Sequence, residues 1–599
     1  MISADKSPDI DHGVLEEARH QALVENTAQA IFYEIQEIEQ DRLVNGQRWV
    51  WELLQNALDA TPQDKQTRVR ISWNEPELVF EHNGDAFTPD ELAHLVYHGS
   101  TKYRHPTKRG KFGRGFLVTH LLSKSVHISG LERDPGGVFR FSAEIDRGGD
   151  ADAIRQGMDF AWEQVKKSRR PVSAESEQSS SYNTRYVYRT DNVGRQAVSA
   201  GLESAKRCLP YVLAFIPELD EVSFVEPGLE LKWRREETQL DPSDNSLRST
   251  QVCLQKAPLL GAAALQPSEE RFTIVEKLCS SSGGECTVSL MLREHQTPEV
   301  LIDDLVPRFF AGGLPVIGTE QLPLPMVIHS AEFQLEARRT GLHLEAAETP
   351  QQIRNWELVS LVPNGYIALL EYGSSKNWAS THLLANISEC PSKSWLNSGK
   401  FTESVVRPVV QQILFSPDIR LVKTIDDERI SVKDAVIPED GPDGKLFDVL
   451  LTWKPVRDNL VERRVLGFWA EALATMARLV EVDVENLPAY WSLKRLALEV
   501  SACADLRDLS EKVDLKQYEG ITHWLNTVIG LIIASVWKPL LMDIPLLPNQ
   551  RGVLCKQSAL YRDPGVDERL KDIAAAIGTD ERLRLLHREI SVPNEMLKD

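Results

Sequence analysis

Two short polar motifs constrain the fold of this chain more than any other feature of its sequence. The first, WELLQNALDA at 51–60, spaces Glu52, Asn56 and Asp59 so that a helix presents all three on one face. Carboxylates and a carboxamide are costly to bury without partners, so this stripe indicates a site for a polar ligand, a metal ion or water. The second motif, GKFGRGF at 110–116, places glycines before an apolar run, which lets backbone N–H groups approach phosphate oxygens.

The order of the motifs is more specific than either motif alone. The polar helix is followed by a strand, a glycine turn (HNGDAFT, 82–88), a polar and basic segment, the glycine loop and a helix. This order resembles the GHKL ATPases (gyrase, the heat-shock chaperones, histidine kinases and MutL), and within them it is most similar to sacsin-like and heat-shock-chaperone-like proteins. The resemblance implies an N-terminal Bergerat-type α/β sandwich that binds ATP and magnesium. Taken alone, the glycine loop also fits an ordinary tight turn.

The resemblance implies a role for each polar residue. Glu52 matches the general base that activates the attacking water, and Asn56 matches the magnesium ligand. Lys102, in a basic segment that would close over the nucleotide as a lid, is our candidate phosphate contact. The implied cofactor-binding residues are Asn56, Asp59, His82, Gly84, Asp85, Ser100, Thr101, Lys102, Gly110, Gly113, Arg114, Gly115, Phe116 and Thr184.

One position departs from the superfamily pattern. Most members place an aspartate where this chain has His82, and that aspartate accepts a hydrogen bond from the adenine amino group. A neutral imidazole accepts this bond in only one tautomer, and Asp85 is the alternative acceptor. Two interpretations stay open: a variant adenine turn of the sacsin-like branch, or a turn histidine in a pocket that no longer binds nucleotide.

The patterning predicts an α+β chain in three parts. We expect the ATP-binding domain at 1–220, an α+β transducer-like middle domain at 221–378, and a largely helical scaffold or partner-binding region at 379–599. In the chaperones the middle domain sends a basic residue to the γ-phosphate, so the resemblance implies a catalytic role for Arg338 or Arg339. The alternative is a pair of surface arginines on a hairpin.

The C-terminal region contains an internal repeat. Residues 419–438 and 544–563 both have the pattern of an apolar strand, a polar turn, a second strand and a short helical step. No nucleophile or metal-ligand spacing occurs in this region, which favours a scaffold or a partner-binding role.

Composition limits the partners. The chain has 68 basic and 88 acidic residues, and its net charge of -20 disfavours nonspecific attraction to nucleic acid or to an anionic membrane. Its seven cysteines show no CxxC pair or zinc spacing, which predicts free thiols. The N-terminus lacks the features of a secretory signal, so we expect a cytoplasmic protein without a membrane segment. A protein client is expected, and a homodimer and a nucleic-acid partner both stay open.

These observations predict a Mg-dependent ATPase in which ATP binding, lid closure and hydrolysis drive a conformational change on a macromolecular client. Such a protein would be chaperone-like or a component of stress or anti-phage defence. A DNA-directed ATPase like MutL or gyrase would share the pocket but would need a basic track. A histidine kinase would need an upstream phosphoacceptor, and neither His12 nor His20 lies in a recognisable acceptor motif. A nucleotide-sensing scaffold would bind ATP without hydrolysing it.

Overall fold

The computed structural model describes residues 13–62, 64–97, 115–173, 181–259, 266–441 and 444–597 of the chain. They form two compact units: Met1–Gly365 with Pro391–Ser398, and Tyr366–Cys390 with Gly399–Asp599. The first is a mixed α+β unit and the second is largely helical, which confirms the predicted fold class. The predicted division into three domains is not tested by this grouping and stays a prediction.

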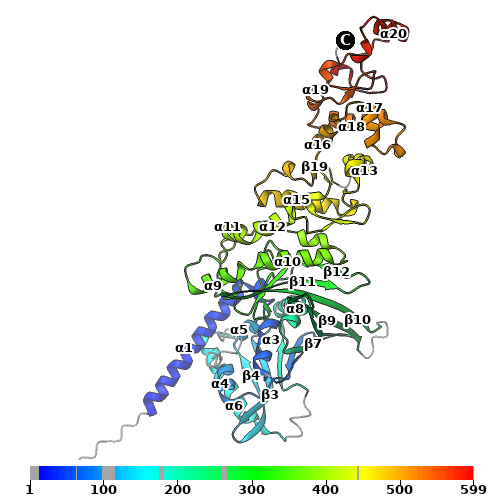
Figure 1. Ribbon diagram of the computed structural model, residues 1–599. Coiled ribbons are helices and arrows are strands. Elements are labelled where there is room, and N and C mark those ends of the chain that lie inside the picture. The colour runs from blue at the N-terminus through cyan, green and yellow to red at the C-terminus, as the bar shows by residue number, and fades with distance from the viewer. Residues whose placement is uncertain are drawn as a thin grey trace, which may run out of the picture. The chain divides into compact units, whose positions relative to one another are not determined.

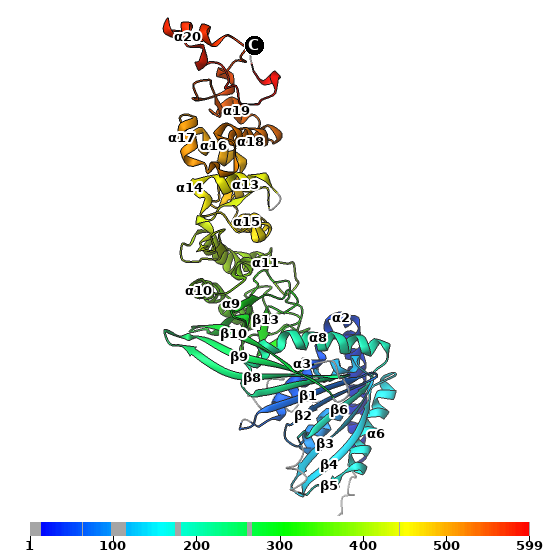
Figure 2. The ribbon, with the colours of Figure 1, turned by 90° about the vertical axis from the view of Figure 1, so that its right-hand side faces the viewer.

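One mixed sheet organises the first unit, and its order within the described residues is β14-β13-β15-β11-β10-β9-β8-β7-β1-β2-β6-β3-β4-β5, with β12 paired to β11 (Figures 1 and 2). Its strands are β1 (Thr67–Asn74), β2 (Glu77–His82), β3 (Ser125–Asp134), β4 (Gly137–Asp146), β5 (Arg170–Pro171), β6 (Thr184–Arg189), β7 (Leu219–Glu226), β8 (Leu229–Asp241), β9 (Asp244–Pro258), β10 (Ser268–Ser281), β11 (Gly284–Arg293), β12 (Glu299–Leu301), β13 (Phe309–Ala311), β14 (Leu314–Pro315) and β15 (Val327–Ser330).

A parallel pairing makes the sheet continuous. β1 pairs with β7 in parallel, with Ile71 opposite Phe224, so the strands of the N-terminal part join the later strands directly. On the other side of β1, antiparallel pairing brings His82 of β2 opposite Thr184 of β6, and Thr184 opposite Gly130 of β3. Two candidate positions, His82 and Thr184, thus lie beside Gly130 in one row across adjacent strands.

The helices of the first unit are α1 (Gly13–Gln40), α2 (Arg42–Asn45), α3 (Trp49–Ala60), α4 (Pro89–Val96), α5 (Gly115–Val118), α6 (Ala151–Ser168), α8 (Asn192–Phe215) and α9 (Pro350–Val359). α4 begins with a capping box: the Thr88 hydroxyl accepts from the Glu91 backbone N–H, and the Glu91 carboxylate accepts from the Thr88 backbone N–H. α6 was not predicted, although its buried residues Ile154, Met158, Ala161 and Val165 have helical spacing.

α3, which carries the polar stripe, is fixed by its opposite face. Its apolar side chains are buried, and two indoles anchor it to α8: Trp49 Nε1 donates to the Ala197 carbonyl at 2.9 Å, and Trp51 Nε1 donates to Ser204 Oγ at 3.1 Å. Two buried indoles with satisfied N–H groups fix the distance of α3 from α8 and its rotation about its own axis. The direction of the polar stripe is therefore set by packing against α8.

Gly201 of α8 allows this close approach, and replacing it should destabilise the first unit. A Cβ at Gly201 would lie 2.0 Å from Trp49 Nε1, inside contact distance. We expect Gly201→Ala to lower the free energy of unfolding by about 1–3 kcal/mol, the usual penalty of overpacking, and to lower the temperature at which the first unit unfolds. Gly530→Ala is the matched control, because a Cβ there meets nothing within 4 Å. Equal midpoints for the two variants would contradict the proposed packing constraint.

The second unit is a succession of short helices and two-residue strands. Its helices are α10 (Val362–Ser375), α11 (Ser398–Phe401), α12 (Arg407–Phe415), α13 (Lys445–Thr452), α14 (Lys454–Arg457), α15 (Leu466–Leu479), α16 (Leu493–Ser501), α17 (Leu506–Lys512), α18 (Ile521–Ala534), α19 (Leu540–Asp543) and α20 (Glu568–Ala576), of which α10 and α11 begin in the first unit. Its strands are β16 (Val422–Lys423), β17 (Arg429–Ile430), β18 (Ile437–Pro438), β19 (Tyr490–Trp491), β20 (Leu547–Pro548) and β21 (Leu554–Cys555).

The predicted internal repeat is confirmed. Within 419–438, β16 and β17 form an antiparallel hairpin that is followed by a 3-10 turn at Val432–Asp434. Within 544–563, β20 and β21 form the same hairpin, followed by a 3-10 turn at Gln557–Ala559.

All seven cysteines are free thiols, as predicted. Across the described parts of the chain, none of the helices combines the length and the apolar character that crossing a membrane requires.

Candidate functional site

Glu52 lies at the centre of the candidate site, in the first turns of α3, and its side chain is buried. Arg339 Nη1 donates to both carboxylate oxygens, at 2.9 Å to Oε1 and 3.2 Å to Oε2, and Arg48 Nη2 donates to Oε1 at 3.1 Å. The two arginines come from opposite ends of the first unit's sequence, so folding brings one carboxylate between two cations. Of the two predicted arginines, Arg339 is the one that contacts Glu52.

Arg48 was not singled out from the sequence, and it connects three parts of the site. One turn before Glu52, it also donates from Nη1 to Asn45 Oδ1 at 2.9 Å and to the Arg338 carbonyl at 3.0 Å. Its spacing of one helical turn from the predicted base is a signal that could have identified it. Through Arg48, the helix with the base is bound to the backbone of the arginine loop.

The arginine loop, Leu335–Leu342, is shaped by a second residue that the sequence analysis missed. The Glu336 carboxylate accepts from the backbone N–H groups of Arg338 and Thr340, each at 2.7 Å, and from Thr340 Oγ1 at 3.0 Å. Arg339 lies between these contacts with a left-handed φ of 57°. A non-glycine residue in this region is strained, and such strain is typical of functional loops.

Charge controls the ionisation of Glu52. Burial alone would raise the pKa of its carboxyl group, but the Arg339 and Arg48 guanidinium groups outweigh burial and lower the pKa below its usual range. The carboxylate is therefore ionised at neutral pH and is neutralised by its neighbours.

His82 holds the glycine turn that follows β2. Its Nδ1 accepts from the Gly84 backbone N–H at 3.1 Å, which places the ring proton on Nε2, and its ring stacks on Tyr186 with centroids 6.2 Å apart. Burial lowers the pKa of His82 to about 4, so the imidazole is neutral. With Nδ1 engaged, the ring has only an Nε2–H donor to offer to a ligand.

The turn packs against the end of α3. The Asp85 backbone N–H donates to the Ala60 carbonyl at 2.8 Å, and a Cβ at Gly84 would lie 2.8 Å from the Ala60 Cβ, so only glycine fits. The Asp85 side chain is exposed and pairs with Lys65 at 3.2 Å. These contacts bring the turn next to the part of α3 that carries Asp59.

Two buried polar atoms beside this turn are consistent with a ligand. Thr184 Oγ1 and Asn183 Oδ1 have no hydrogen-bond partner among the described residues, while Asn183 Nδ2 donates to the Gly84 carbonyl at 3.0 Å. Buried polar atoms are nearly always satisfied, by protein, water or ligand. A nucleotide with its bound water fits this requirement.

The described end of the glycine loop lies against Glu52. A Cβ at Gly115 would lie 1.9 Å from Glu52 Oε2, so the chain can pass here only as glycine. Phe116 is buried with its ring edge against His120 and its centroid 5.9 Å from that of Tyr186. The candidates Ser100, Thr101, Lys102, Gly110, Gly113 and Arg114 lie outside the described residues.

Asn56 and Asp59 follow Glu52 along α3 and are partly buried. The carboxamide oxygen of Asn56 is a hard ligand of the kind that magnesium prefers. Its assignment as the metal ligand, and the assignment of Asp59 to the nucleotide, stay predictions.

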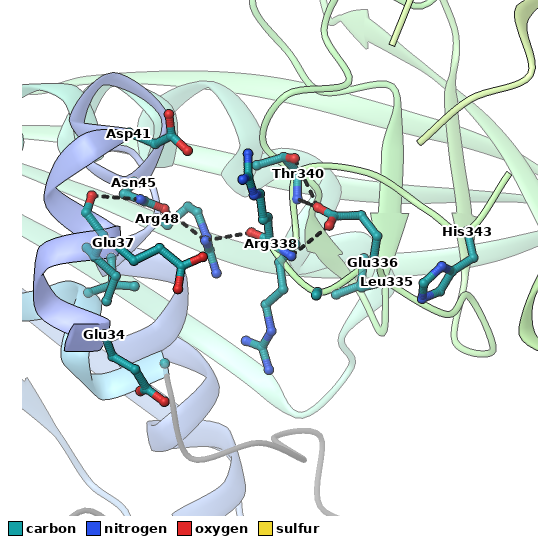
Figure 3. Close-up of a pocket in the computed structure, with 15 residues that line it drawn as sticks. Glu34, Glu37, Asp41, Asn45, Arg48, Leu335, Glu336, Arg338, Thr340 and His343 are labelled. Atoms are coloured by element: carbon teal, nitrogen blue, oxygen red, sulfur yellow. Dashed lines mark hydrogen bonds between the residues drawn. The ribbon is translucent and has the colours of Figure 1, made fainter. Parts of the chain in front are cut away.

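A cavity of about 400 Å³ opens beside the arginine pair (Figure 3). Glu34, Glu37 and Asp41 line it from the side of α1, and Arg338 and Thr340 line it from the arginine loop. Gly115 and Arg339 also border it, so the cavity reaches the surroundings of the Glu52 carboxylate.

Within the described residues, one other group has ligand-type side chains at close range, Glu236, Cys253 and Glu269 on the sheet. Arg271 pairs with both carboxylates, so a cation of the chain itself already binds them. Burial, together with the two carboxylates, raises the pKa of the Cys253 thiol to about 12, so it stays protonated. This group is therefore an ion-pair cluster.

Residues 43–148 match the family model described as histidine kinase-, DNA gyrase B-, and HSP90-like ATPase. This segment contains Glu52, the glycine turn and the glycine loop, so the chain carries a GHKL-type ATPase domain. A comparison with curated proteins gives no match. One solved structure that matches is that of the ATPase and transducer domains of DNA topoisomerase II from Balamuthia mandrillaris, with 12% identity and a TM-score of 0.21. The match covers 32% of this chain and 56% of that one.

Proposed function

We propose that the chain is a Mg-dependent ATPase of the sacsin-like or heat-shock-chaperone-like type. The observation that carries the proposal is the arrangement around Glu52, whose carboxylate is bound by an arginine 287 residues further along the chain. A buried carboxylate and an arginine from a distant, strained loop are the two charges that phosphoryl transfer to water requires. The GHKL-type domain at 43–148 supports the same conclusion.

Glu52 is the proposed general base, which takes a proton from the attacking water. In the arrangement described above, its lone pairs are engaged by Arg339 and Arg48, so it is a poor base. Catalysis requires Arg339 to release Glu52 and to turn toward the negative charge that develops on the transferred phosphoryl group. Arg48 keeps its own contact to Glu52 and preserves the direction of the carboxylate.

Asn56 is the proposed ligand for magnesium, which when bound neutralises phosphate charge. The nucleotide would be held by Asp59, Asp85 and Thr184 at the glycine turn and by the backbone from Gly110 to Gly115 at the phosphates. His82 would hold the turn through Gly84.

Transfer of Arg339 from Glu52 to a bound nucleotide would pull on the loop Leu335–Leu342 and on the later strands of the sheet. This coupling is how ATP would change the conformation of the chain on a protein client, in a chaperone-like role or in stress or anti-phage defence. Turnover at such sites is often slower than in metabolic enzymes, because domain motion rather than the chemical step limits the rate.

The test is steady-state ATP hydrolysis by the full chain with magnesium and with EDTA, alongside ATP binding by calorimetry. We expect binding and slow phosphate release that needs magnesium. Binding without hydrolysis would instead indicate a nucleotide-sensing scaffold, and no binding would reject the proposal. Stimulation of ATP hydrolysis by duplex DNA would indicate that the macromolecular partner is DNA and not a protein.

A further inference from the structure

The second unit consists of two structural repeats with a constant offset in residue number. β16, β17 and the turn Val432–Asp434 correspond to β20, β21 and the turn Gln557–Ala559. The same offset relates two pairs of isolated bridges: Thr424–Val461 to Asn549–Leu586, and Val436–Leu460 to Tyr561–Leu585. α13 and α20 occupy the same place between these bridges, so α20 is the second repeat's copy of α13.

In the first repeat, the apolar face of α13 packs against α18, which precedes the second hairpin in the chain. Leu446, Val449 and Trp453 are buried, and Trp453 stacks on Trp524 of α18 with ring centroids 5.7 Å apart. Trp524 Nε1 also donates to Thr452 Oγ1 at 3.0 Å. α13 is thus the receiving surface of a helix–helix joint, and α18 is the helix that fills it.

The corresponding face of α20 is exposed. Aligned on their C-cap residues, Trp453 and Ile577, the two helices place Leu570, Ile573 and Ile577 at the positions of Leu446, Val449 and Trp453, one residue away from the offset of the strands. The three side chains of α20 are 59%, 60% and 78% exposed. In Figures 1 and 2, α20 lies at the C-terminal end of the second unit, whereas α13 lies among other helices of that unit. Three large aliphatic side chains in one exposed stripe indicate a binding surface.

The strand position of the joint differs between the two repeats. In the first repeat, the backbone N–H groups of Ile437 and Glu439 donate to the carbonyls of Ala489 and Trp491, at 2.9 Å and 3.0 Å. Their counterparts Arg562 and Pro564 line a cavity of about 360 Å³. Pro564 has no N–H to donate, which disfavours an added strand here and leaves the helix face as the docking surface.

The face is preformed. On its other side α20 is held by Lys571, whose buried ammonium group donates to Asp563 Oδ2 at 2.7 Å and to Gln550 Oε1 at 2.9 Å. Arg582 Nη2 donates to Glu568 at 2.6 Å. A helix fixed in this way loses little conformational entropy when its apolar stripe is covered.

We propose that the stripe Leu570, Ile573 and Ile577 binds an amphipathic helix of a partner protein that presents an aromatic side chain, as α18 does to α13. A second folded copy is not the expected occupant, because the residues of α18 that would fill the stripe, among them Trp524, Val528 and Ile532, are already buried in their own chain. This inference is independent of the ATPase activity.

The test uses the α18 sequence as the probe. A fluorescein-labelled peptide of residues 520–535, with flanking lysines for solubility, is titrated with the full chain and followed by anisotropy. We expect saturable binding to the wild type and at least about tenfold weaker binding to the double variant Ile573→Glu and Ile577→Glu. Val536→Glu is the matched control, because Val536 is an apolar residue outside α20 that is 83% exposed, and this variant should bind as the wild type does.

A second measurement does not depend on protein variants. The peptide with Trp524→Ala should bind the wild-type chain at least about tenfold more weakly than the unaltered peptide. No binding to the wild type, or equal binding to the double variant, would overturn the proposal. A wild-type dimer in sedimentation that the double variant converts to monomers would also overturn it, in favour of a second copy.

Discussion

Replacing Glu52 with glutamine should abolish steady-state ATP hydrolysis while leaving ATP binding intact. Glutamine keeps the shape of the side chain and one acceptor for Arg339, but its amide cannot take a proton from water. General bases contribute about 10²- to 10⁴-fold to rates, so we expect a loss of at least about 100-fold in kcat. The measurement is phosphate release at saturating ATP, with ATP binding followed by calorimetry.

Glu37→Gln is the control for this variant. Glu37 lines the cavity beside the site but is exposed, and no role in proton transfer is assigned to it. We expect its rate to stay within about twofold of the wild type, as for most exposed substitutions. Hydrolysis by Glu52→Gln at the wild-type rate would show that Glu52 is not the general base. Loss of binding by Glu52→Gln would show instead that the carboxylate supports the fold of the pocket.

The sequence predicted the local parts of the site because they are encoded locally. The stripe of α3 follows from helical spacing. The capping box of α4 is also encoded locally, since its two partners lie within one turn. By contrast, the close approaches of Gly84 to Ala60 and of Gly115 to Glu52 join residues far apart in the sequence, so they are seen only in the fold.

Contacts between distant segments could not be predicted in the same way. Sequence spacing does not reveal that Arg339, rather than Arg338, reaches Glu52, because this depends on the left-handed φ at Arg339 and on the hydrogen bonds that Glu336 makes across the loop. Similarly, the role of His82 in nucleotide binding stays a prediction, and the sequence did not reveal that its Nδ1 accepts from the Gly84 backbone N–H. The hydrogen-bond partner of a side chain in a turn is a property of the folded geometry.

Removing the side chain of Arg339 should slow hydrolysis strongly, whereas removing that of Arg338 should have little effect. Arg339 contacts the Glu52 carboxylate and is the proposed stabiliser of transition-state charge, so we expect Arg339→Ala to lower kcat about 10²- to 10³-fold, somewhat less than the 10³- to 10⁵-fold contribution of arginine fingers. Arg338 is exposed, and it is the backbone carbonyl of Arg338 that accepts from Arg48. Arg338→Ala keeps this carbonyl and is therefore the matched control.

The pH dependence of kcat/KM separates a catalytic arginine from a purely structural one. Burial raises the pKa of Glu52, and the guanidinium group of Arg339 makes the largest contribution in the opposite direction. Without Arg339 the pKa of Glu52 rises. The base then becomes protonated at a higher pH, and the acid limb of the kcat/KM profile shifts to higher pH. Arg338→Ala should leave this limb in place. If both arginine variants lose activity equally, or if the acid limb of Arg339→Ala does not move, then the ion pair between Glu52 and Arg339 does not control the base, and the loop serves the fold alone.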